Sequence, residues 1–302
     1  MAADPRSHER RALLLSLAVT GALGSAALVW GIISGSSVIL FDGLYMLAGI
    51  VLVAVSLVAA RTAETRPTPD YPFGRHGATP LAVCLQGAAL LATLVYGASD
   101  AVAVIVNGGS DASAGSVVAY GIVSAALSLV VMIFLRGPAR LSQLAQAELV
   151  SWRAGALLSL MVAVGGVVAV IMRRSEAESA AAYVDPVLVL IASAAIAPMA
   201  TSLLRQGLRE LMEAAPPAEL RANIEAAAAA AAAEYELPDP IVRATRLGRR
   251  LYVEVDFLVQ PGDWRVEDED RVRRFVVDRL ESSDYQLWAT VELSTDPTLI
   301  ED

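Results

Sequence analysis

Six apolar segments, each near the ~20 residues that a membrane-spanning helix needs, constrain the fold of this chain most. The chain is 56% hydrophobic over 302 residues, which is more apolar than an ordinary soluble protein. We therefore expect residues 1–209 to form an all-α membrane domain, a bundle of six helices. The segments are residues 12–33, 37–60, 79–106, 116–135, 148–172 and 185–204.

Arginine is distributed unevenly over the connections between these segments. It precedes the first segment and follows the second, fourth and sixth, whereas the connections after the first and third contain none. Arg173 and Arg174, after the fifth segment, are a local exception. By the positive-inside rule, this predicts a multi-pass protein of the inner (plasma) membrane with both termini in the cytoplasm. A basic stripe with interleaved aromatic residues is absent from the sequence, so we expect no nucleic-acid partner.

The sequence changes character after residue 209, where a second domain, residues 210–302, is expected in the cytoplasm. Residues 216–234 begin with proline and continue into an alanine tract, which favours a helix. Residues 241–245, 251–259 and 285–293 are typical of strands, and residues 268–282 have helical spacing. The order αββαβ predicts a ferredoxin-like α+β domain with both helices on one face of the sheet.

Asp42 is the only Asp, Glu, Lys, Arg or His between Arg11 and Arg61, and it lies within an apolar segment. A charge in the bilayer costs a few kcal/mol, so such groups usually face a bundle interior and have a function. The alternative is that Asp42 caps a helix or reaches the membrane surface.

Residues 70–77 (DYPFGRHG) form a second distinctive element. Pro72 excludes helical geometry at Tyr71, and Gly74 permits a positive φ. A stiff turn is therefore expected, from which Arg75 can reach a phosphate or a carboxylate. His76 is a candidate functional residue, and a simple connector is the alternative.

Four stretches together resemble the cation diffusion facilitator family of metal–proton antiporters: residues 37–44 (SVILFDGL), 70–77, 147–158 and 183–186 (YVDP). The resemblance implies a transporter rather than an enzyme, and a homodimer in the lipid bilayer. It further implies that a divalent cation is transported as substrate in exchange for protons, with no permanently bound cofactor.

The resemblance also assigns a transport site, from which this sequence departs. In the family, helices two and five each carry a pair of ligands four residues apart, on one helix face. The pairs correspond here to Asp42 with Met46 and to Ser151 with Gly155. With one carboxylate among four positions, we do not expect a high-affinity tetrahedral Zn²⁺ site.

Three nearby residues can substitute for the missing ligands. Glu148 lies one turn before Ser151 and can pair with Asp42, or it is simply an acid at a helix start. Tyr45 can offer an oxygen, or serve as an interfacial aromatic residue. Gln86 is a polar residue in an apolar stretch.

These features favour proton-coupled cation efflux by alternating access, with Asp42 as the titrating carboxylate. The alternatives are a transport-incompetent paralogue acting as a scaffold, and a transporter of a non-zinc or monovalent cation. Residues 210–302 contain no histidine, which excludes metal sensing by imidazole and favours a dimer contact. Its strand acids, Glu254, Asp256 and Glu292, are expected on a solvated face.

Overall fold

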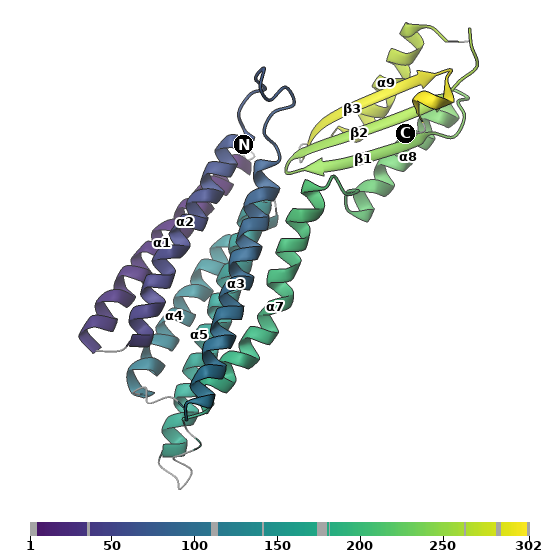
Figure 1. The fold of residues 1–302 in the computed structure, drawn as a ribbon. Helices are drawn as coiled ribbons and strands as arrows, with labels where there is room; N and C mark the ends of the chain where they lie inside the picture. Colours follow the sequence, from purple (N-terminus) through teal and green to yellow (C-terminus); the bar gives the residue numbers. More distant parts are fainter. Residues whose placement is uncertain are drawn as a thin grey trace. The chain divides into compact units, whose positions relative to one another are not determined.

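The computed structural model describes residues 5–34, 37–109, 114–140, 142–173, 180, 182–262, 264–281 and 285–300. It divides into two compact units, which are described separately (Figure 1). The first contains residues 1–65 and 78–208, and the second contains residues 66–77 and 209–302. The loop at 66–77, placed between two expected spans, therefore belongs with the C-terminal domain by its contacts.

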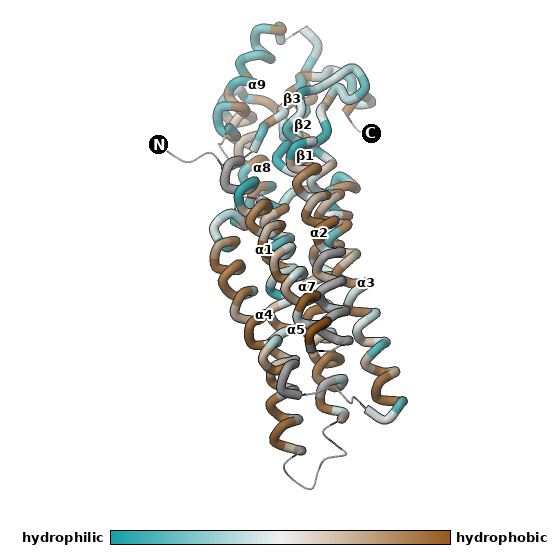
Figure 2. Tube along the Cα trace, turned by 90° about the vertical axis from the view of Figure 1, so that its left-hand side faces the viewer, coloured by the Kyte–Doolittle hydropathy of each residue, from teal (hydrophilic) through white to brown (hydrophobic). Residues whose placement is uncertain are grey.

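The first unit consists of long helices because its sequence offers apolar side chains in every direction and few helix breakers. Hydrophobic residues cover these helices along most of their length (Figure 2). Among the described residues, four helices are long and apolar enough to cross a membrane, those containing residues 10–30, 78–106, 118–135 and 186–211. The expected number of six membrane-spanning helices stays a prediction. The helices are α1 (Pro5–Ser34), α2 (Ser37–Ala63), α3 (Ala78–Val106), α4 (Ala114–Leu135), α5 (Gln143–Arg173) and α7 (Val184–Leu211).

Two glycines bring α3 and α7 into backbone contact. A Cβ atom built on Gly87 would lie 2.5 Å from the backbone nitrogen of Leu204, and one built on Gly207 would lie 2.7 Å from the backbone nitrogen of Cys84. Real Cβ contacts do not reach these distances, so only glycine allows the two helices this close. The approach positions α3, and with it Gln86, against the rest of the bundle.

The second unit is a three-stranded sheet in the order β1-β2-β3, with helices packed on one face. Its elements are α8 (Ala218–Glu234), β1 (Ile241–Leu247), β2 (Arg250–Leu258), α9 (Val266–Leu280) and β3 (Gln286–Ser294). Strand β2 pairs antiparallel with β1 and parallel with β3. The αββαβ order expected from the sequence is therefore present.

Alternation along β2 separates the two faces of this sheet. Val253, Val255 and Phe257 are buried in a core with Ile224 of α8 and Val276 of α9. The intervening residues of β2 belong to the opposite face, where the helices do not pack. This second face carries most of the charged residues of the strands.

Candidate functional site

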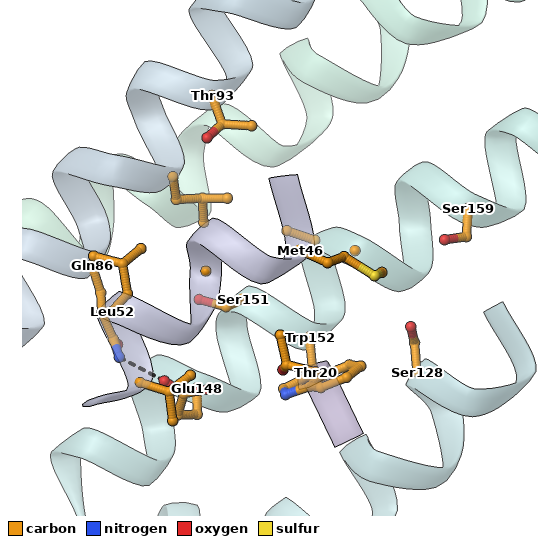
Figure 3. A pocket seen from close by; sticks show the side chains of 15 residues that line it. Thr20, Met46, Leu52, Gln86, Thr93, Ser128, Glu148, Ser151, Trp152 and Ser159 are labelled. Carbon is orange, nitrogen blue, oxygen red and sulfur yellow. Dashed lines mark hydrogen bonds between the residues drawn. The ribbon is translucent and has the colours of Figure 1, made fainter. Parts of the chain in front are cut away.

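A cavity of about 180 Å³ lies inside the first unit, among α1, α2, α3, α4 and α5. Its wall mixes apolar side chains with neutral polar groups, and one ionisable side chain, Glu148, lines it among the described residues. Figure 3 shows these side chains converging from several helices. The lining residues are Thr20, Met46, Gly49, Leu52, Val53, Gln86, Leu90, Thr93, Ser128, Glu148, Ser151, Trp152, Ala154, Gly155 and Ser159.

Glu148 is the centre of a buried hydrogen-bond network. Its side chain is 3% exposed. Ser16 Oγ of α1 donates to Glu148 Oε2 at 2.8 Å, and Gln86 Nε2 of α3 donates to Glu148 Oε1 at 2.7 Å (Figure 3 shows the latter). Donors from two other helices therefore hold both carboxyl oxygens.

Two further side chains extend the network. Trp152 Nε1 donates to Ser16 Oγ at 2.8 Å, and Gln86 Nε2 also donates to Ser56 Oγ of α2 at 2.6 Å. The sequence analysis did not identify Ser16, Ser56 or Trp152. The signal available for the serines is the one that singled out Gln86, a polar residue within an apolar helix.

The position of Glu148 excludes one of its two expected roles, that of an acid at a helix start. Helix α5 begins at Gln143, so Glu148 lies in its second turn and is buried. The alternative of an acid at the helix start is therefore wrong. The segment expected at 148–172 begins five residues too late, because residues 143–147 are helical despite being less apolar.

Three of the four positions assigned by resemblance line the same cavity. Met46 of α2 and Ser151 and Gly155 of α5 face it together with Glu148. Figure 3 shows Met46 and Ser151 at its wall. The backbone of Asp42 is helical, but its side chain and that of Tyr45 lie outside the described residues.

The spacing along α2 bears on a pairing of Asp42 with Glu148. Gln86 Nε2 donates to both Ser56 Oγ and Glu148 Oε1, so the Glu148 carboxyl group lies close to Ser56 along the axis of α2. Asp42 precedes Ser56 by 14 residues in one continuous helix, or about 21 Å along its axis at 1.5 Å per residue. The hydrogen bonds of Glu148 thus form well away from the Asp42 backbone.

The donor set of the cavity is poor in zinc ligands. Its described lining residues offer one carboxylate, one amide, several hydroxyls and the Met46 thioether. Within the described ranges, no group of three or more His, Cys, Asp or Glu side chains is placed to hold a metal ion. Carboxylate, amide and hydroxyl oxygens suit hard cations better than Zn²⁺.

The loop at 66–77 forms an aromatic cluster within the second unit. Phe73 packs edge-to-face on Trp288 of β3, with ring centroids 5.7 Å apart, and the Arg75 guanidinium lies 4.3 Å from the Tyr71 ring centre. Gly74 has φ +87°, as expected for the turn. Burial lowers the pKa of His76, and the positive charge of Arg250 lowers it further.

Asp256 of β2 corrects an expectation about the strand acids. Its side chain is 2% exposed, so a solvated face does not explain it. Arg243 Nη1 donates to Asp256 Oδ2 at 3.0 Å. Burial first, and then the nearby negative charge of Glu254, raise the pKa of Asp256 to about 6, while Arg243 opposes this shift.

Long apolar helices around a cavity that contains a buried carboxylate are typical of a membrane protein with an internal site for polar cargo. The family model described as the cation efflux transmembrane domain matches residues 13–212. The chain therefore belongs to the cation efflux family, whose members are membrane transporters of metal cations. A comparison with curated proteins found no match.

Proposed function

We propose that this transporter exports a divalent metal ion by alternating access, with protons moving in the opposite direction. One observation carries the proposal. Met46 of α2 and Ser151 and Gly155 of α5, which correspond to the family's ligand pairs, line one and the same cavity. Asp42, one turn before Met46 on α2, would supply the titrating carboxylate. The protein would work as a homodimer in the inner membrane, with both termini in the cytoplasm.

The cavity also limits the kind of cation. Ser151 contributes a neutral oxygen, Met46 a soft sulfur and Gly155 no side chain. Zn²⁺ favours several charged or imidazole ligands, so we expect weak Zn²⁺ affinity compared with a complete four-ligand site. A cation that accepts few protein ligands and retains part of its water shell, such as Mg²⁺ or Mn²⁺, fits this donor set better.

Cation flux into everted vesicles tests the proposal. A panel of divalent and monovalent cations is presented with and without an imposed pH difference. Asp42→Ala should abolish the flux, whereas Asp100→Asn should leave it unchanged, because Asp100 is an exposed acid on α3 outside the cavity lining. Unchanged flux in Asp42→Ala would refute the mechanism.

Restoring the missing ligands gives a complementary test. The triple substitution Met46→Asp, Ser151→His and Gly155→Asp should raise Zn²⁺ affinity at least about tenfold in calorimetry. A Cβ atom at Gly155 would meet no atom within 4 Å, so the first carbon of the aspartate side chain fits without a clash. No gain would show that these three positions do not converge on one ion.

The second candidate function is a transport-incompetent scaffold. The observation that favours it is the scarcity of charged ligands in the described part of the cavity wall. Metal analysis and calorimetry with divalent cations discriminate between the two in the purified protein, because a scaffold should bind no divalent cation specifically in its membrane domain. A third candidate, transport of a monovalent cation, predicts flux of Na⁺ or K⁺ in the same vesicles.

A further inference from the structure

The Glu148 carboxyl group is buried in the membrane domain, and the described side chains that contact it are neutral. Among the described side chains of the adjoining helices, Arg10, Arg11, Arg61 and Arg153 are exposed. Its interactions within the described residues are hydrogen bonds to neutral groups. An isolated charge buried in this way is costly, so Glu148 must be neutralised, either by a proton or by a bound cation.

Gln86 provides an independent sign of a missing ligand. Its side chain is 3% exposed, and both hydrogens of Nε2 are used, by Ser56 and by Glu148. Its other polar atom, Oε1, is buried with no hydrogen-bond donor in the described structure. Buried carbonyl oxygens nearly always have a partner, and a cation beside Glu148 would supply one.

The donors and the charge indicate which cation fits. At this end of the cavity they are the oxygens of Glu148 and Gln86, with the Ser151 hydroxyl on the same wall. Oxygen ligands of this kind select hard cations. One carboxylate exactly neutralised by one positive charge avoids leaving a net charge in the bundle, which favours a monovalent ion over a divalent ion.

The soft donor of the cavity, the Met46 thioether, lies away from Glu148. Met46 precedes Ser56 by 10 residues on α2, about 15 Å along the helix axis. The cavity therefore has an oxygen-rich end at Glu148 and a different end toward Met46 and Asp42.

We propose that Glu148 and Gln86 form a separate site for a small monovalent cation, represented by Na⁺, at the oxygen-rich end of the cavity. A role of this ion in transport, as a coupling ion distinct from the metal cargo, rests on the proposed function. The binding of the ion to Glu148 and Gln86 is independent of the proposed function. Occupancy would neutralise Glu148 and give Gln86 Oε1 its missing partner.

Trp152 offers a built-in reporter of this site, because its indole donates to Ser16, which donates to Glu148. The purified full-length protein is titrated with NaCl against choline chloride at constant ionic strength, and tryptophan fluorescence is recorded. We expect a saturable response that Trp152→Phe and Glu148→Gln remove and the matched membrane acid variant Asp100→Asn retains. Gln86→Leu should raise the half-saturating Na⁺ concentration at least about tenfold.

Three results would overturn the proposal: a Na⁺ response that survives in Glu148→Gln, a tighter response to Mg²⁺ than to Na⁺, or a response to acidification alone. If Glu148→Gln does not fold, Gln86→Leu decides, since an unchanged half-saturating concentration would also refute the site. The assay needs no transport. Absence of flux in vesicles would therefore reject the proposed function without affecting the Na⁺ site. Absence of the fluorescence response would reject the Na⁺ site without affecting the proposed function.

Discussion

Asp256 should make the C-terminal domain less stable as the pH rises toward neutrality. Its pKa is raised from 3.8 to about 6 in the folded protein, so the folded state binds the proton more tightly than the unfolded state. Between these two values the folded state holds more protons, and the free energy of unfolding falls with increasing pH. A salt-bridged carboxylate with a lowered pKa would give the opposite slope.

The magnitude follows from the shift. About two pKa units correspond to about 3 kcal/mol, which is an upper bound. The partner Arg243 has a side chain that is 38% exposed, so water screens the charges around Asp256. After this screening we expect a loss of about 1–2 kcal/mol between about pH 4.5 and about pH 7.5.

Hydrogen exchange of the full-length protein in detergent measures this effect. Strand β2 is central in the sheet, so its slowest amides report opening of the whole domain once intrinsic rates are corrected. Asp256→Asn should flatten the pH dependence, whereas Glu225→Gln, an exposed acid of α8, should keep the wild-type slope. A wild-type stability that rises over this range, or an Asp256→Asn variant that follows the wild type, would refute the reasoning.

Two further substitutions test the packing. Gly87→Ala should lower the thermal stability in detergent by about 1–3 kcal/mol because its Cβ would overlap the α7 backbone, while Gly97→Ala, with open space around it, should be tolerated. An equal response of both variants would contradict the backbone contact. Phe73→Ala should remove the edge-to-face contact with Trp288, worth about 0.5–1.5 kcal/mol, and speed hydrogen exchange in the loop at 66–77 about three- to tenfold. Unchanged exchange there would show that the aromatic pair does not hold the loop.

The C-terminal domain was largely predictable because its signals are local. The Ala tract fixed a helix at 216–234, close to α8 at Ala218–Glu234, and alternation located β2 to within a residue at each end. The parallel pairing of β2 with β3 was not predicted, since pairing depends on contacts between distant segments. The burial of Asp256 was missed for the same reason, because Arg243 reaches it from the neighbouring strand.

The cavity was only partly predictable. The expected ligand positions Met46 and Ser151 came from the resemblance to the family, and both line the cavity. The hydrogen bond of Ser16 to Glu148 joins residues 132 positions apart, and periodicity contains no information about such a contact. Small hydroxyl residues also pack readily in apolar helices, so the polarity of Ser16, although it is the same kind of signal that singled out Gln86, is a weak one.

The grouping of the loop at 66–77 with residues 209–302 has a mechanical consequence. The chain crosses between the two units at three places, two at the ends of the loop and one between residues 208 and 209, within the last turn of α7. A domain on a single tether can swivel freely, but one tied at several points has fewer rotational degrees of freedom. Cutting the protein near residue 209 would therefore leave part of this unit behind. A fragment of residues 210–302 would lack the edge-to-face contact of Phe73 with Trp288. Dissection at that boundary would yield two incomplete pieces.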